Sequence, residues 1–203
     1  GAEAALAEFH LGRATAQLQA LHARFPCLET VALPSQVARF ARANAFMAYN
    51  DQEEEEARQW LWTARSAMPE WPWPAFVAGE HPIRQLLDDQ LEPSLDGPPG
   101  KGLVSPKRGG VFWNGLPLGV PAVPKDVPGL TQVVDAKGIV FDAYWQEGGR
   151  FREHLLGVAG PPLPVPSWYV AESTPQVASG PEPSACKSTS IAAFEEQVDQ
   201  AAA

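Results

Sequence analysis

The chain has 203 residues, 45% of them hydrophobic, and a formal net charge of −9 at pH 7. This length and composition allow one medium domain or two small ones with a real core, and they exclude a wholly disordered chain. The acidic balance argues against a nucleic-acid partner, because binding to phosphate backbones needs a concentrated basic surface.

The first 93 residues are predicted to form an antiparallel helical domain. A first helix is expected over Ala2–Arg24, with Leu6 and Phe9 on its apolar face. A second helix follows, for which Ser35 is the expected N-cap. In the third, Asp51 and the residue three positions later have the form of a capping pair.

A fourth, shorter helix is expected to begin near HPIRQLLDDQL. Its proline stands at a position that the first turn of a helix tolerates. The side chains expected to face inward are Ile83, Leu86, Leu87 and Leu91.

The second and third helices carry a repeat-like pattern. Ala57, Leu61, Ala64 and Pro69 give the small, large, small and proline spacing that lets paired helices pack closely. The segment 36–69 therefore resembles a degenerate tetratricopeptide repeat, although its first half has small residues where the family prefers larger ones. The resemblance implies a scaffold for protein contacts, because stacked helix pairs bury a core only against neighbours.

The composition changes at EPSLDGPPGKG, which predicts a linker at 94–102. Asn114-Gly115 then gives a strong hairpin signal, and a second turn at 135–138 separates strands expected at 131–134 and 139–145. A small antiparallel β module is thus expected at 103–159, which makes the fold class α+β. The stretch VFWNGLPLGVPAV is similar to surface β modules of the PEGA type, and this similarity implies an envelope or surface setting.

Several strings mimic catalytic motifs but lack essential parts. GPPGKG has Leu95 and Gly102 where a phosphate-binding loop needs its first glycine and its hydroxyl. SACK has the form Ser-x-x-Lys, but no Ser-Asp-Asn or Lys-Thr-Gly follows. The histidines and cysteines lack metal-ligand spacing. We therefore expect a protein that is not an enzyme and has no cofactor or metal, with an enzyme of an unrecognised class as the remaining alternative.

Of the 7 tryptophans, several crowd into WLWTARSAMPEWPWPAF. Trp60 and Trp62 must point to different sides of a helix, and Trp71 and Trp73 lie between prolines. In one interpretation Trp60 packs inside and Trp71 and Trp73 cover the corner next to the linker. In the other, Trp71 and Trp73 form a subunit interface or a platform for glycan.

The 2 cysteines also allow two interpretations. Cys27 could be a buried small hydrophobe and Cys186 an incidental thiol of the tail. Alternatively, Cys27 and Cys186 form a disulfide, within one chain or between neighbours, which would require an oxidising compartment.

Residues 160–188 are rich in Pro and Ser and predict an extended linker, followed by a C-terminal docking helix at 189–203. A helix this short is marginal alone, so its apolar stripe needs a groove. We expect that groove beside the first helix, near Leu6 and Phe9, on the same chain or on the next copy. The stripe consists of Ile191, Phe194 and Val198, and the linker residues expected to contact the β module include Trp168, Tyr169 and Val170.

Together these features predict a structural subunit of a bacterial extracellular or surface assembly, a homopolymeric filament joined head to tail by the C-terminal linker and helix. The composition, rich in Ala, Pro and Arg, is typical of GC-rich bacteria. We expect a secreted or cell-surface location after signal removal, and no membrane span. The alternative is a monomeric envelope binding module that recognises protein or glycan through a Trp-rich edge.

Overall fold

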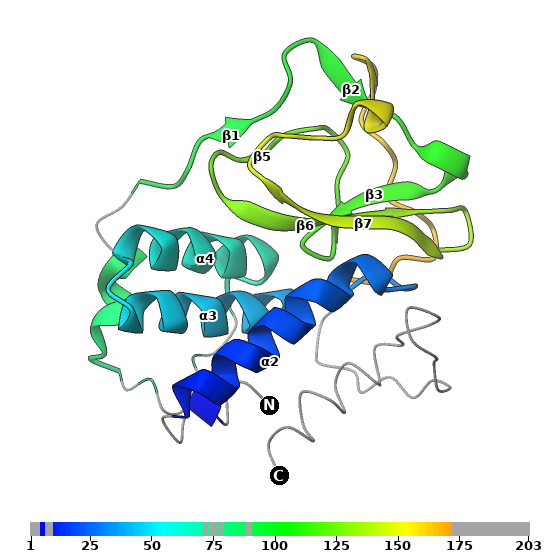
Figure 1. Ribbon diagram of the computed structural model, residues 1–203. Helices are drawn as coiled ribbons and strands as arrows, with labels where there is room; N and C mark the ends of the chain where they lie inside the picture. The colour runs from blue at the N-terminus through cyan, green and yellow to red at the C-terminus, as the bar shows by residue number, and fades with distance from the viewer. Residues whose placement is uncertain are drawn as a thin grey trace.

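The computed structural model describes residues 5–6, 10–70, 73, 77, 79–87 and 91–171. Its longer helices are α2 (Leu11–Arg24), α3 (Pro34–Asn50) and α4 (Glu54–Ala67), which form a layer on one side of the strands (Figure 1). The 3₁₀ helices are η1 (Phe25–Cys27), η2 (Pro82–Leu87), η3 (Pro106–Arg108) and η4 (Glu153–Leu155). The predicted α+β class is confirmed. The predicted C-terminal helix at 189–203 lies outside the described residues.

Helix α3 begins two residues earlier than the sequence suggested, so the prediction of Ser35 as N-cap is wrong. Pro34 is the first helical residue, a position where its missing N–H costs nothing. The N-cap is Leu33, whose backbone N–H donates to Oε1 of Gln36 across 3.1 Å. Ser35 lies inside the helix and is buried.

The predicted capping pair at the start of α4 is wrong for a similar reason. Asp51 is the C-cap of α3, and its backbone N–H donates to the carbonyl of Met47 across 3.0 Å. Gln52 then adopts a φ of 67°, and Glu53 becomes the N-cap of α4, without a side-chain capping bond. Because Asp51 caps the end of α3, it cannot also cap the start of α4.

The expected fourth helix is a 3₁₀ helix, η2, rather than an α-helix. Ile83 is fully buried beneath it, and Leu86 and Leu87 are half-buried in the same apolar cluster. Leu91 is 94% exposed, so the prediction that it faces inward is wrong. Helix η2 ends at Leu87, so Leu91 is not on the helix and does not share the buried face of Ile83.

The strands form a four-stranded antiparallel sheet and two strand pairs. The sheet has the order β4 (Leu116–Pro117), β3 (Gly110–Trp113), β6 (Pro128–Val134) and β7 (Val140–Glu147). Strand β1 (Leu95–Asp96) pairs with β5 (Val123–Pro124), and β2 (Lys101–Leu103) pairs with β8 (Leu156–Val158). The segment 94–102, predicted as a linker, thus contributes two strands of its own.

Both predicted hairpins are present in the structure. Asn114 and Gly115 join β3 to β4 with φ of 50° and 83°, as a two-residue hairpin turn requires. The second turn, at 135–138, joins β6 to β7. Here Oδ1 of Asp135 accepts the N–H groups of Lys137 and Ile139, which lowers the pKa of that exposed carboxyl, the Ile139 bond most strongly.

The helices and the sheet share one apolar core. Leu130 and Trp145, opposite each other on β6 and β7, pack into the same cluster as Phe25 and Phe40 of the helical layer. The other face of the sheet carries Trp113, which packs in a second cluster against β2, β5 and β8 residues. The sheet is therefore covered on both sides, and β6 is buried along nearly its whole length.

Polar side chains fix the helical layer to the sheet. Asn114 donates through Nδ2 to Oγ of Ser66 in α4 across 2.9 Å and accepts the N–H of Leu130 in β6 across 2.8 Å. Gln132 accepts the N–H of Ala32 across 2.8 Å and donates to the carbonyl of Thr30 across 3.2 Å. The Asn114 bonds join α4 to the sheet, and the Gln132 bonds join the connection between α2 and α3 to it.

Candidate functional site

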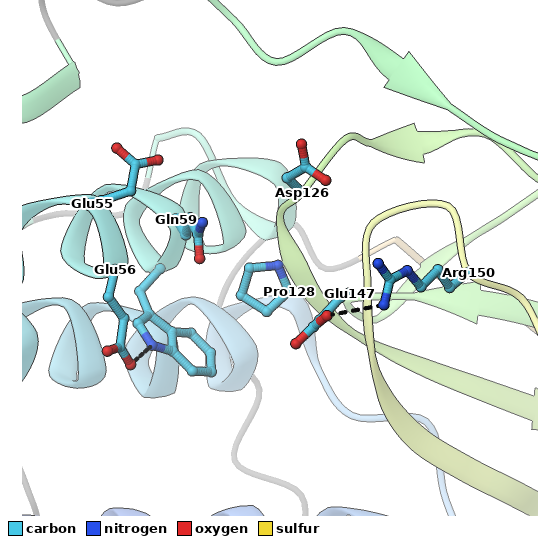
Figure 2. A pocket seen from close by; sticks show the side chains of 8 residues that line it. Glu55, Glu56, Gln59, Asp126, Pro128, Glu147 and Arg150 are labelled. Carbon is cyan, nitrogen blue, oxygen red and sulfur yellow. Dashed lines mark hydrogen bonds and ion pairs between the residues drawn. The ribbon is translucent and has the colours of Figure 1, made fainter.

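A cleft of ≈ 640 Å³ opens where the N-terminal half of α4 approaches the sheet. Figure 2 shows that one wall comes from α4 and the other from the turns at the ends of β6 and β7. The cleft is lined by Glu55, Glu56, Gln59, Trp60, Asp126, Pro128, Glu147 and Arg150.

The α4 wall carries carboxylates one turn before an aromatic ring. Glu55 and Glu56 lie in the first turn of α4, where the helix dipole favours negative charge. Glu56 accepts a hydrogen bond from the indole N–H of Trp60 across 3.3 Å (Figure 2), which orients the ring along this wall. Glu55 forms an exposed ion pair with Arg58.

The opposite wall is built by two turns that lie against each other. Asp126 has a φ of 56°, and Gly148 has a φ of 54°. A Cβ added to Gly148 would lie 2.8 Å from the backbone nitrogen of Asp126, so glycine lets the turns approach. Glu147 pairs with Arg150 across 3.4 Å on the solvent side of this wall.

The bottom of the cleft is held rigidly. Thr63 Oγ1 in α4 donates to the carbonyl of Pro128 across 2.6 Å, which joins the two walls directly. Behind the cleft, the Trp60 ring packs edge-on against Trp145 at 5.6 Å and against Phe40 at 5.7 Å. These contacts with Trp145 and Phe40 therefore hold the Trp60 ring in place.

His22 belongs to the same aromatic cluster, although it does not line the cleft. Its ring stacks on Trp145 with 5.5 Å between centroids and on Phe40 with 6.2 Å. Partial burial against these rings lowers the pKa of His22, although the residue remains partly exposed to solvent. These contacts therefore favour the neutral form of the ring.

Carboxylates outnumber cationic groups in the cleft, since Arg150 is the one basic residue among its lining side chains. Among the described residues, no group of His, Cys, Asp and Glu is arranged to hold a metal ion. Trp60 is half-buried, and a negative field next to a partly accessible indole is chemically complementary to an organic cation, which can lie over the ring and pair with the carboxylates.

The structure places the residues singled out in the sequence at separate locations. Leu6 is 1% exposed within the helical core. Trp73 is half-buried, with Arg42 and Arg84 4.8 and 5.6 Å from its ring centroid. Trp168 and Tyr169 pack on Phe112 of β3. The remaining predicted interface residues lie outside the described residues: Phe9, Trp71, Ile191, Phe194 and Val198.

Cys27 is disulfide-bonded in the structure. The interpretation of Cys27 as a buried free thiol is therefore wrong. Cys186, its predicted partner, lies outside the described residues, and the pairing of these two cysteines stays a prediction.

Sequence reasoning missed the cleft because its walls lie far apart in the chain. The acidic run before Trp60 indicates a helix start, and nothing near it in sequence points to Asp126 or Glu147. The sequence signal that could have indicated the cleft is the pair Glu56 and Trp60. These residues are four positions apart and therefore lie on the same face of α4.

No family model, curated protein or solved structure matches this chain significantly. The described helices include none long and apolar enough to cross a bilayer. The class of protein defined by fold and site is thus an α+β domain with an acidic, aromatic cleft at the junction of its two layers.

Proposed function

We propose that this protein is a non-enzymatic binding module of the bacterial cell exterior, and that its cleft binds lysine or arginine side chains of a partner protein. The observation that carries the proposal is the fixed Trp60 ring with Glu56 beside it and Asp126 and Glu147 across the cleft. A cation over an indole contributes about 0.5–1 kcal/mol when exposed and about 2 kcal/mol when desolvated. The surrounding carboxylates add steering and select against acidic partners.

The disulfide at Cys27 supports the setting of this proposal. Disulfides persist in oxidising compartments such as the periplasm and the cell surface. A module held in that environment would meet basic segments of envelope or secreted proteins. The tetratricopeptide-like helix pair and the PEGA-like hairpin segment, as proposed from the sequence, suit the same scaffold role.

Calorimetric titration with a short Lys/Arg-rich peptide tests the proposal, with a neutral chitin oligosaccharide as the competing ligand class. We expect the peptide to bind, more weakly at high salt, because exposed charges are screened. Trp60→Leu and Glu147→Gln should each weaken binding by about tenfold, equivalent to ~1.4 kcal/mol. Glu153→Gln changes an exposed carboxylate in η4, outside the cleft, and should leave binding unchanged.

Two results would reject the basic-partner proposal. One is peptide binding that survives Trp60→Leu unchanged. The other is a salt-insensitive, Trp60-dependent response to the oligosaccharide alone, which would assign the cleft to glycan.

A second candidate function is the head-to-tail structural subunit expected from the sequence. It is favoured by the course of the C-terminal segment, which docks through Trp168 and Tyr169 and reaches Val170, 84% exposed, beside a groove of ≈ 300 Å³. The chain continues from that surface point toward the predicted docking helix. A neighbouring copy would provide the groove that an apolar helix, marginal alone, needs.

Light scattering after gel filtration tests this second candidate. Phe194→Asp charges the centre of the predicted stripe and should abolish assemblies larger than the monomer. Gln200→Asp adds the same charge on the opposite side of the predicted helix and should preserve them. Equal behaviour of the two variants would rule out assembly through this stripe.

A further inference from the structure

Residues 161–170, PPLPVPSWYV, form a strap that runs from one face of the sheet to the other. Leu163 packs in the cluster of Trp113, whereas Trp168 and Tyr169 pack in the cluster of Phe112 on the opposite face. Between them the chain turns at Pro166, whose carbonyl accepts the N–H of Tyr169 across 3.0 Å. The backbone N–H of Leu163 donates to the carbonyl of Gly119 across 2.8 Å.

Glycines mark the places where the strap touches the body of the protein. A Cβ on Gly119 would lie 3.2 Å from Cβ of Pro162, and one on Gly110 would lie 3.0 Å from Cγ of Pro166. A Cβ on Gly138 would lie 3.2 Å from the indole of Trp168. Side chains at these positions would push the strap away, so the glycines together form a shallow track for it.

The strap ends on an aromatic anchor. Phe112 of β3 is fully buried, and the Trp168 ring stacks on it with 5.6 Å between centroids at 25°. The Tyr169 ring lies 5.5 Å from the same phenylalanine. Beyond this anchor, Val170 is again exposed. The track therefore recognises a proline-rich segment followed by an aromatic pair.

We propose that the track, formed by Gly110, Phe112, Gly119 and Gly138, is an interaction surface that accepts residues 161–170 of a second copy of this chain. Release of the strap uncovers Phe112 and the clusters that Leu163, Trp168 and Tyr169 pack against, and docking of the same segment from a second copy restores these contacts. Exchange of an identical segment between copies is therefore a low-cost route to association. The proposal is independent of the acidic cleft and of the terminal helix.

In dilute solution we expect the track to be occupied by the chain's own strap rather than by the strap of another copy. A tethered segment has an effective concentration of about millimolar, and a strap from another copy must exceed that value. Exchange is therefore expected only when copies are crowded or when the chain's own strap is weakened. This competition makes the track testable with paired variants.

The experiment uses two full-length variants with opposite defects. Trp168→Ala removes the anchor of the strap but leaves the track open. Gly110→Val blocks the track at Pro166 while its own strap stays intact and undocked, and valine is well suited to a strand. We expect an equimolar mixture to form a one-to-one heterodimer in native mass spectrometry, whereas each variant alone stays monomeric.

A matched control replaces Gly110→Val with Gly79→Val, where a side chain meets open space. Its strap remains docked, so its mixture with Trp168→Ala should yield at least tenfold less heterodimer. Equal heterodimer in both mixtures, or none in either, would overturn the proposal.

A labelled peptide of residues 160–171 keeps the test decisive if Gly110→Val does not fold. Fluorescence anisotropy should show the peptide binding at least tenfold more tightly to Trp168→Ala than to the unaltered chain, whose track is filled. Leu163→Ala is the second variant with a weakened strap, and it should also bind more tightly than the unaltered chain. Equal affinity of all three proteins for the peptide would contradict an exchangeable strap.

Discussion

At the scale of single residues, close contacts determine which side chains the fold accepts. Gly129 of β6 lies directly under the ring of Trp113, which is 5% exposed. A Cβ at position 129 would lie 2.0 Å from Cζ2 of that ring. Neither the strand nor the buried indole has space to move away.

Gly129→Ala should therefore destabilise the protein by about 1–3 kcal/mol, the usual cost of overpacking a core. Urea unfolding followed by circular dichroism measures this change. The matched control is Gly12→Ala in α2, where an added Cβ meets nothing within 4 Å. It should be neutral or stabilising by up to about 1 kcal/mol, because alanine favours helix. Equal effects of the two substitutions would contradict the contact with Trp113.

His22 makes stability depend on pH. Burial lowers its pKa in the folded protein below the value of about 6.5 in the unfolded chain. The unfolded chain then binds the proton more readily, so stability falls as the pH drops through the window between the two pKa values.

Urea unfolding at a series of pH values between neutral and mildly acidic tests this expectation. His22→Phe keeps a ring against Phe40 and Trp145 but cannot be protonated. It should retain more of its neutral-pH stability under acidic conditions than the unaltered chain does. Parallel stability profiles for the two proteins would show that His22 is not responsible.

At the scale of elements, the connection between α2 and α3 depends on one buried side chain. Gln132 of β6 is fully buried and bonds both Ala32 and Thr30 of that connection. Ala32 is itself 1% exposed, so its N–H has no access to water if the glutamine oxygen is lost.

Gln132→Leu should cost about 1–3 kcal/mol, because it leaves a buried amide without an acceptor. Hydrogen exchange measured by NMR should also show faster exchange at the Ala32 amide. A loss below about 0.5 kcal/mol with unchanged exchange would contradict this role, because surface substitutions typically fall within that range.

The elements themselves were more predictable than their connections. The hairpin at Asn114 and Gly115 follows from local chemistry, since both residues tolerate a positive φ. Predictions from neighbouring residues were wrong where the preceding element extended further than expected. Asp51, for example, caps the end of α3 instead of the start of α4. The cleft was not predictable because Trp60 and Glu147 meet only through the packing of α4 on β6.

At the scale of the whole molecule, the disulfide at Cys27 links the helical layer to another cysteine. The chain has 2 cysteines, so we predict a bond from Cys27 to Cys186. In the chain-entropy model, a bond that closes a loop this long stabilises the folded protein by about 4–5 kcal/mol.

Intact-mass measurement after alkylation, without and with reductant, tests the pairing in freshly isolated protein. We expect no modified cysteine without reductant and both cysteines modified with it. Gel filtration under the same non-reducing conditions distinguishes a bond within one chain from a bond between copies. Free thiols in the unreduced sample would remove the support for an oxidising compartment.

The bonds from Gln132 to the connection between α2 and α3 also have a consequence for biosynthesis. They span 100 and 102 positions of the chain, so the helical layer is made long before the strand that covers it. At roughly 5–20 residues per second, β6 follows Ala32 from the ribosome after about 5–20 s. During this interval the apolar faces of α2 and α3 have no sheet to cover them. Because these contacts are so distant in sequence, we expect the chain to fold slowly.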